Sequence, residues 1–248
     1  MGKKYKNPPI REAVCEFRFP KEKRWDLTIP GLFYNEIKEV FPLKERRLSQ
    51  LLHVNPGGQR PAYTFDIEEK AIFLAKDRKI FVQLGLNEPV MSVHHLSPYT
   101  SWENFSEKIK MVFECLNDLV KTDMLVRIGL RYINQIEIPK DDFDIAKYFN
   151  LSPVVNDIPF EQFTSFFLGV DIGYEDTDCI CRTQFTTTVP RRDDCVAYIL
   201  DFDYFNNPQT SVPAENVAEW IEAAHSRIEE IFEKCIKDAL RDRFMEGI

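Results

Sequence analysis

The chain has 248 residues, of which 44% are apolar and 29% are charged. This composition is typical of a globular protein and excludes a disordered or collagen-like chain. No apolar run approaches the roughly 18 residues of a membrane-spanning helix, and residues 1–7 lack the apolar core of a secretory signal. We therefore expect a soluble cytoplasmic protein without membrane association, whose six cysteines are reduced.

The formal net charge of −8 is unevenly distributed along the chain. Residues 1–47 carry 12 basic and 7 acidic side chains, whereas residues 137–178 carry 2 basic and 10 acidic ones. Binding of nucleic acid through bulk charge needs clustered Lys and Arg side chains opposite the phosphates. We therefore do not expect non-specific nucleic-acid binding, although a local contact at the basic amino end stays open.

Strand patterns, in which apolar and polar residues alternate, recur along the chain. The expected strands span residues 13–19, 63–67, 80–84, 91–95, 125–138, 163–175, 179–190 and 195–205. The last three follow one another with short turns, which predicts an antiparallel meander. The acidic, proline-containing stretch 137–162 is expected to be a crossover before this meander.

Three other segments have apolar residues at helical spacing. The expected helices span residues 32–41, 105–120 and 217–240. Thr100 and Glu103 have the spacing of a capping box before the second helix, and Asn216 and Glu219 have it before the third. In such a box, each side chain satisfies a backbone N–H group that has no partner within the helix.

Runs of strands followed by single helices predict an α+β fold, with a mainly antiparallel sheet and amphipathic helices packed on one face. We expect a single compact domain over residues 1–248. Two similar halves, about 1–138 and 139–248, each contain a meander and then a helix with Trp102 or Trp220 near its start. An internal duplication of a sheet-plus-helix unit explains this match, and so does chance similarity between two amphipathic helices.

Carboxylates on strand faces are the first candidates for a functional site. Period two places Asp201 and Asp203 on one face of their strand, and a meander brings Asp171 to that face as well. Three carboxylates on one sheet surface could hold a divalent cation for phosphoryl or hydrolytic chemistry.

Arginines on neighbouring strands allow two other interpretations. Arg127, Arg131 and Arg182 are on strand faces of matching polarity, so they could neutralise the carboxylates across the sheet. They could also line a polar pocket, where guanidinium groups make bidentate contacts to the carboxylate or phosphate of a small or peptidic ligand.

Common catalytic and metal-binding motifs are missing from the sequence. His94 and His95 are adjacent, so on a strand they point to opposite faces and cannot bind one metal ion together. The sequence has no His-x-x-x-His, Cys-x-x-Cys or Gly-x-Ser-x-Gly motif. We therefore expect no cofactor and no resident metal.

Trp25, near the basic amino end, is the expected anchor for a protein partner, because aromatic side chains contribute strongly to interfaces. A solvated basic face around it is the alternative. We expect a protein partner, with a small ligand and a homodimer as open alternatives.

Four segments together resemble a sporadically distributed family of uncharacterised prokaryotic proteins of about this length. They are the segment that begins Asn7-Pro8-Pro9-Ile10 and ends at Phe19, the strand Arg127-Ile128-Gly129-Leu130-Arg131-Tyr132-Ile133-Asn134, the run Leu200-Asp201-Phe202-Asp203, and the helix segment 225–233. The resemblance covers nearly the whole chain. It implies no established activity, ligand or catalytic residue. The patchy distribution of the family implies, by association, an accessory role in mobile defence or toxin–antitoxin loci.

Two hypotheses for function follow from these residues. The first is a non-enzymatic interaction or regulatory module that binds a protein partner or a small ligand. The alternative is a metal-dependent phosphoesterase or nuclease that uses Asp171, Asp201 and Asp203. A structure in which each of these carboxylates is paired with an arginine favours the first hypothesis, because a shared cation needs the same oxygen atoms at about 2.3–2.6 Å.

Overall fold

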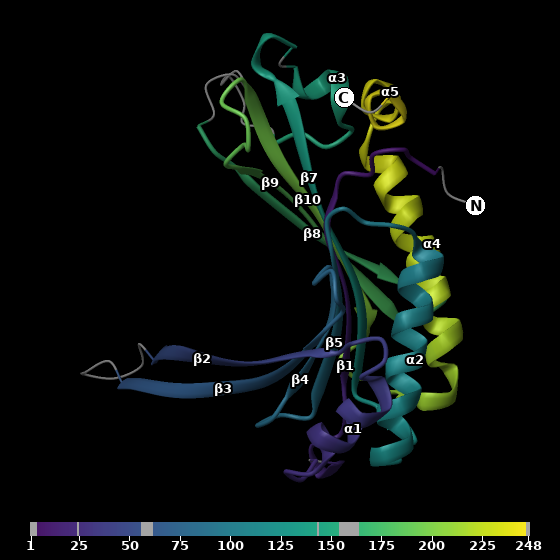
Figure 1. The fold of residues 1–248 in the computed structure, drawn as a ribbon. Coiled ribbons are helices and arrows are strands. Elements are labelled where there is room, and N and C mark those ends of the chain that lie inside the picture. Colours follow the sequence, from purple (N-terminus) through teal and green to yellow (C-terminus); the bar gives the residue numbers. More distant parts are fainter. Residues whose placement is uncertain (1–3, 24, 56–61, 143, 154–163, 247–248) are drawn as a thin grey trace.

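The computed structural model describes residues 4–23, 25–55, 62–142, 144–153 and 164–246 (Figure 1). It confirms the predicted α+β fold. Nine strands form one antiparallel sheet in the order β2-β3-β4-β5-β1-β7-β10-β9-β8. The strands are β1 (Ile10–Arg18), β2 (Leu43–Asn55), β3 (Ala62–Leu74), β4 (Ile80–Gly85), β5 (Val90–Leu96), β7 (Arg127–Pro139), β8 (Phe167–Tyr174), β9 (Cys179–Thr188) and β10 (Cys195–Asn206). A separate two-stranded ladder joins β6 (Met124–Leu125) and β11 (Val212–Pro213).

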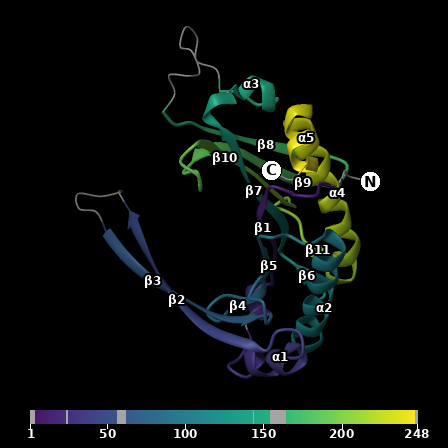
Figure 2. The ribbon, with the colours of Figure 1, turned by 45° about the horizontal axis from the view of Figure 1, so that its top comes forward.

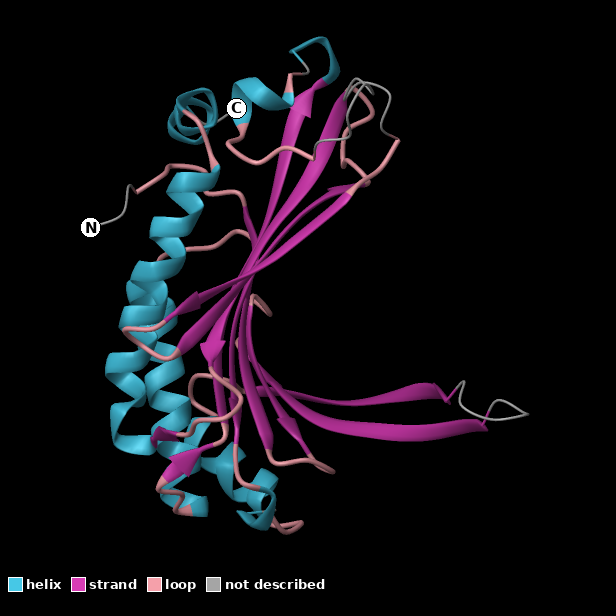
Figure 3. Ribbon diagram, turned by 180° about the vertical axis from the view of Figure 1, so that it is seen from behind, coloured by secondary structure: helices cyan, strands magenta, loops and turns pink. Residues whose placement is uncertain are grey.

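The helices lie on one side of the sheet (Figures 1 and 3). They are α1 (Ile29–Ile37), α2 (Trp102–Val120), α3 (Ile145–Tyr148), α4 (Val217–Cys235) and α5 (Asp238–Glu246), with 3₁₀ turns η1 (Lys21–Lys23), η2 (Lys140–Asp142) and η4 (Ala214–Asn216). The sheet is bent, and its other face lies on the inside of the bend (Figure 2). We call this other face, turned away from α2 and α4, the open face. In the described ranges of the chain, no helix is long and apolar enough to cross a membrane.

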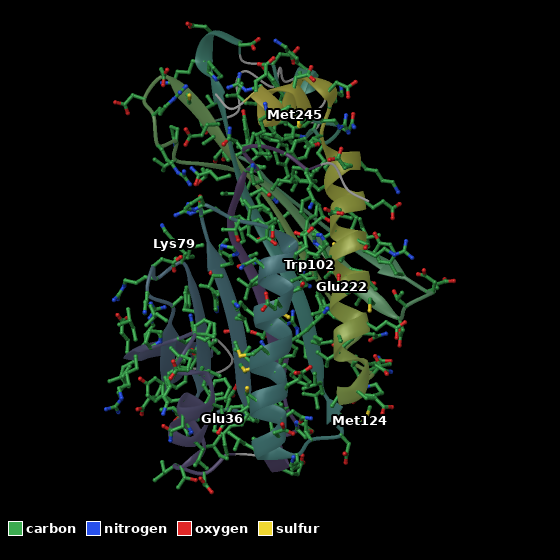
Figure 4. All side chains as sticks on the ribbon, turned by 45° about the vertical axis from the view of Figure 1, so that its right-hand side comes forward. Glu36, Lys79, Trp102, Met124, Glu222 and Met245 are labelled. Atoms are coloured by element: carbon green, nitrogen blue, oxygen red, sulfur yellow. The ribbon has the colours of Figure 1, made fainter. Side chains whose placement is uncertain are left out.

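Side chains of α2 and α4 hold the helix layer together. The indole of Trp102 on α2 donates a hydrogen bond of 2.6 Å to Glu222 on α4 (Figure 4). The Lys110 ammonium donates to the same carboxylate at 2.7 Å. The Trp102 ring also stacks on His225 of α4, with ring centroids 4.1 Å apart. These contacts fix the two helices side by side above the sheet.

The hydrophobic core lies between the sheet and the helices. Buried side chains from β1 to α5 form one cluster, which spans both halves of the chain. Phe17 of β1 packs on Phe113 of α2 with ring centroids 5.0 Å apart, and Phe202 of β10 packs on Phe232 of α4 at 6.2 Å. Full burial of one such side chain contributes about 1.5–3 kcal/mol to stability, so these rows hold the helices on the sheet.

The order of the elements repeats along the chain. One half runs from β1 through α1 and a meander to α2, and the other runs from β7 through α3 and a meander to α4. β1 and β7, the first strand of each half, pair antiparallel within the sheet. If the chain repeats one unit, this order places the division between α2 and β7, and not at residue 138. The duplication itself stays a prediction.

The strand β2 was not predicted from the sequence. It pairs with β3 along its whole length. Residues 43–48 of β2 are exposed, and β2 forms one edge of the sheet. The run Lys44-Glu45-Arg46-Arg47 shows no alternation because an edge strand in contact with solvent on both faces does not need any.

Several predicted helix ends differ from the structure. The N-cap of α2 is Ser101, whose hydroxyl accepts a hydrogen bond of 3.2 Å from the Asn104 N–H, and not Thr100. Asn216 makes no side-chain cap on α4. The predicted helix over 217–240 is two helices, because Asn150 binds the last carbonyl groups of α4 and Ile236 is extended.

The meander of β8, β9 and β10 is confirmed. The expected crossover before it contains η2 and α3. Residues 154–163 of that crossover, with the start of the strand predicted from residue 163, lie outside the described residues.

Candidate functional site

All six charged residues predicted for the site lie on the open face. β7 supplies Arg127 and Arg131, β10 supplies Asp201 and Asp203, β9 supplies Arg182, and β8 supplies Asp171. Each alternates with side chains that point toward the helices, such as Leu200 and Phe202, which are fully buried. We call these six residues the charge cluster. The strand order β7-β10-β9-β8 makes it continuous across four neighbouring strands.

Asp201, which pairs with Arg131, has the least exposed charged side chain of the cluster. The Nε atom of Arg131 lies 2.9 Å from Asp201 Oδ1, and its Nη2 atom lies 2.5 Å from Oδ2. The Asp201 side chain is only 7% exposed, whereas that of Arg131 is 44% exposed. The hydrogen bond to Asp201 raises the pKa of Arg131 above its ordinary value. The pair therefore has a buried anion and a cation that still faces solvent.

Arg127 bridges carboxylates on two different strands. Its Nη1 atom donates to Glu16 of β1 at 2.8 Å, and its Nη2 atom donates to Asp203 at 3.1 Å. The guanidinium lies over the ring of Phe205, 4.8 Å from the centroid. A Cβ atom at Gly129 would lie 2.8 Å from Arg127 Nη1. Gly129 thus leaves the space in which this guanidinium rests.

The pKa of Asp203 lies above its ordinary value, chiefly because the side chain is buried. Burial raises its pKa above the ordinary value, while Arg127 and Arg131 lower it and Asp201 adds to the rise. Partial burial between two cations and a second anion gives this mixed environment.

Arg182 and Asp171 form an exposed pair at the margin of the cluster. The pair is bidentate, with Nε to Oδ1 at 2.9 Å and Nη2 to Oδ2 at 2.8 Å. The hydrogen bond from Arg182 lowers the pKa of Asp171. Because both side chains are about half exposed, water screens the pair and its contribution to stability is about 0–1 kcal/mol.

A shallow hollow lies within the cluster. It has a volume of about 120 Å³ and is lined by Arg131, Arg182, Gln184, Asp201 and Asp203. Sites for whole small molecules usually measure about 300–1,000 Å³. The hollow is therefore large enough for one side-chain head group or a few water molecules.

The arrangement of donors differs from a metal centre. Within the described parts of the chain, no three His, Cys, Asp or Glu side chains are placed to hold one metal ion. Asp171, Asp201 and Asp203 each accept hydrogen bonds from a different arginine. A shared cation would have to displace these guanidinium groups, so the geometry favours charge neutralisation.

The open face also carries a hydrogen-bonded chain that the sequence did not reveal. The Ser92 hydroxyl lies 2.8 Å from His94 Nε2, and His94 Nδ1 lies 2.7 Å from Glu12 Oε1. The His94 ring stacks on Phe81 at 4.5 Å, and the hydrogen bond to His94 lowers the pKa of Glu12. The residues follow the order of a serine hydrolase triad.

The backbone of β5 around Ser92 does not supply the electrostatic half of such a site. β5 pairs with β4 on one side and with β1 on the other, where Ser92 is opposite Gln83 and Glu16. The backbone N–H groups of β5 therefore pair with the neighbouring strands and cannot form an oxyanion hole. We regard Ser92, His94 and Glu12 as a polar network that orders the open face.

Trp25 is half-buried, and its role as the anchor for a protein partner stays a prediction. Its indole N–H donates to the Gly85 carbonyl at 2.6 Å, and its ring contacts Phe19 edge to face at 5.4 Å. It lines a second hollow of about 350 Å³ with residues 86–89. The fully exposed Leu27 follows two residues later. These contacts hold the Trp25 ring in place.

Comparisons with known proteins found no match: no protein-family model, no curated protein and no solved structure matches the chain. The resemblance to a prokaryotic family therefore stays a prediction. A fold class alone implies no function.

Proposed function

We propose that the chain is a non-enzymatic interaction module whose open face binds a partner protein through the charge cluster. The observation that carries this proposal is the placement of the cluster. Half-buried charges lie across four strands on a sheet face over which the structure shows no helix (Figure 3). Removing a charged side chain from water costs free energy, and an ion pair offsets part of that cost. Ion pairs on an uncovered sheet face therefore fit a surface that a partner covers in a complex.

The balance of charge favours a protein over a nucleic acid. Arg127, Arg131 and Arg182 are each bound to a carboxylate of the same surface. Recognition of a phosphate backbone requires cations that are not already neutralised. A neutral surface of alternating sign instead selects a protein with the complementary pattern and rejects like charges.

The size of the hollow favours a protein over a small ligand. About 120 Å³ can enclose one head group of a side chain, such as an amide or a guanidinium, but not a whole metabolite. The remaining contact area would then come from the sheet surface around it. This combination is typical of a protein interface with one inserted side chain.

The cluster is also ordered before binding. Arg127 is held by Glu16, Asp203 and the Phe205 ring. Immobilising a free long side chain at an interface costs about 0.5–1.5 kcal/mol. Because Arg127 is already held in the free protein, binding does not have to immobilise it. Arg and aromatic residues are common centres of binding energy in interfaces.

The family resemblance guides the search for the partner. An accessory protein of a mobile defence or toxin–antitoxin locus is expected to act with the products of neighbouring genes. Co-expression with those products and co-purification would provide the partner for quantitative work.

The test fills the hollow without breaking an ion pair. Gln184 lines the hollow and is opposite Asp201 in the register of β9 and β10. Gln184→Trp is expected to weaken binding of the partner at least about tenfold, because the bulky ring occupies the space for the inserted side chain. Glu107→Trp, on the exposed face of α2, is the matched control and should bind as the wild type does.

Both variants should be folded, as judged by circular dichroism and by thermal melting. Equal affinity of Gln184→Trp and wild type would contradict the proposal. Loss of binding in Glu107→Trp alone would move the interface to the helix layer.

A further inference from the structure

β8, which supplies Asp171 to the charge cluster, is one of the two edge strands of the sheet, and much of it is exposed. Among the described residues, only β9 pairs with it. Phe167 is 67% exposed, Val170 is 47% exposed and Ile172 is 36% exposed. Three large apolar side chains therefore contact water on a strand whose outer edge has no partner.

The usual protections of an edge strand are missing from β8. Its sequence, Phe167-Leu168-Gly169-Val170-Asp171-Ile172-Gly173-Tyr174, has no Lys and no Pro. Its one charged residue, Asp171, is bound to Arg182 of β9 and is thus turned toward the molecule's own sheet. Natural proteins block exposed edges with charge, proline or a cover, because a bare edge pairs with other strands.

The backbone of β8 presents a regular row of free groups. The Thr187 N–H of β9 donates to the Phe166 carbonyl. Since these groups alternate along a strand, the even-numbered residues of β8 face β9. The N–H and C=O groups of residues 167, 169, 171 and 173 consequently point to the outer edge.

We propose that the outer edge of β8 binds β8 of a second copy of this chain, antiparallel, so that one sheet continues through a homodimer. A second copy is the occupant favoured by the sequence of β8, because the strand is complementary to itself in one register. This inference concerns the edge of the sheet and is independent of the function proposed for the open face.

The geometry of the dimer limits the choice of register. Residues directly opposite each other in an antiparallel pair point to the same face. A two-fold axis normal to the sheet keeps the helices of both copies on the same side. Such an axis must pass between two copies of the same residue, one from each chain. An axis at Val170 pairs residues 167–173 and an axis at Asp171 pairs residues 168–174, which are the two longest overlaps.

The side chains match in this register. Val170 lies opposite Val170 of the second copy, Leu168 lies opposite Ile172, and Phe167 lies opposite Gly173. A Cβ atom at Gly173 would meet no atom within 4 Å, so there is space beside it for the Phe167 ring. Such apolar cross-strand pairs contribute about 0.2–1 kcal/mol each, in addition to the hydrogen bonds of the ladder.

The neighbouring registers are less favourable. With the axis at Asp171, two carboxylates would be opposite each other, which is destabilising. With the axis at Gly169, the pairing would cover only residues 167–171. The Val170 register therefore combines the longest overlap with apolar pairs.

The first test is the oligomeric state in solution, measured by size-exclusion chromatography with light scattering. The wild type is expected at twice the chain mass of 29.2 kDa. Val170→Lys should give the monomer mass, because it places two ammonium groups opposite each other. Val189→Lys, which changes an exposed valine beyond the end of β9, is the matched control and should remain a dimer.

The second test reads the register through disulfides. In a Cys115→Ala background, which removes the one half-buried native thiol, Val170→Cys should form a crosslinked dimer on oxidation. Ile172→Cys alone should not, because the two introduced sulfurs would be about 13 Å apart along the strands. Mixed Leu168→Cys and Ile172→Cys chains should crosslink with each other.

A wild type that is monomeric at roughly 100 μM, where a micromolar dimer would be nearly complete, would overturn the inference. So would a dimer that Val170→Lys leaves intact and that Val170→Cys does not crosslink. Neither result would affect binding of a partner protein at Gln184.

Discussion

Arg131 binds Asp201, which is its diagonal neighbour across β7 and β10, although Asp203 lies directly opposite it in the register. Asp203 in turn binds Arg127. Arg131 is thus two residues along β7 from the position opposite its carboxylate, and Arg127 is four residues from the position opposite its own. Burial raises the pKa of Asp203, whereas Arg127 and Arg131 both lower it, so the two ion pairs interact electrostatically.

Removal of Arg131 should be far more costly than removal of Arg182. Arg131→Ala leaves the nearly buried Asp201 carboxylate without its cation, and we expect a loss of about 2–3 kcal/mol in the free energy of unfolding. Arg182→Ala leaves Asp171, which water already solvates, so the loss should stay under about 1 kcal/mol. Urea denaturation of the two variants measures the difference. Equal losses of unfolding free energy in the two variants would mean that Asp201 is not a nearly buried carboxylate that depends on Arg131.

Stability should depend on pH through His95. This residue is buried against Tyr99 and Phe105, and its Nδ1 atom has no hydrogen-bond partner. Burial lowers the pKa of His95 from its ordinary value of 6.5, an effect that Asp77 partly opposes. The folded state therefore favours the neutral imidazole ring. The contribution of the neutral ring to the free energy of unfolding is fully present above pH 6.5 and is lost as the pH falls below that value.

His95→Phe removes this titration. The difference in unfolding free energy between wild type and variant should shift in favour of the variant as the pH falls from 7 to 5. Because other titrating groups cancel in the difference, parallel pH profiles for the two proteins would contradict the account. Denaturant titrations at several pH values provide the measurement.

The cysteines should differ strongly in reactivity. Five of the six are buried, and only Cys115 is partly exposed. Burial raises the pKa of Cys181 and of Cys235 to about 12, which leaves almost no thiolate at neutral pH. Iodoacetamide should therefore modify one thiol in the native protein and six in denaturant, as counted by mass spectrometry. Fast labelling of several native thiols would show that the core opens more readily than its packing implies.

Much of the charge cluster could be predicted from the sequence because period two determines the face of each strand residue. Alternation alone places Asp201 and Asp203 together, and it places Arg127 and Arg131 together. It does not reveal which residues meet across strands, because register depends on the whole sheet. The diagonal pairing of Arg131 with Asp201 is for this reason visible only in the structure.

Two other features could not be predicted, for different physical reasons. The contact of His94 with Glu12 needs β1 beside β5, which are far apart in the chain and are brought together only by tertiary packing. β2 was missed because a solvated edge strand carries no apolar period. The helical spacing of apolar residues continues beyond Cys235, so the sequence predicts one helix. In the structure, Asn150 ends α4 by donating hydrogen bonds to the carbonyl groups at its end.

Site-specific photo-crosslinking tests the central proposal most directly, because it reports which face contacts the partner. A photoreactive amino acid at Gln184 on the open face should capture the partner protein, and one at Glu107 on α2 should not. Capture from Glu107 with none from Gln184 would contradict the assignment of the open face as the binding surface.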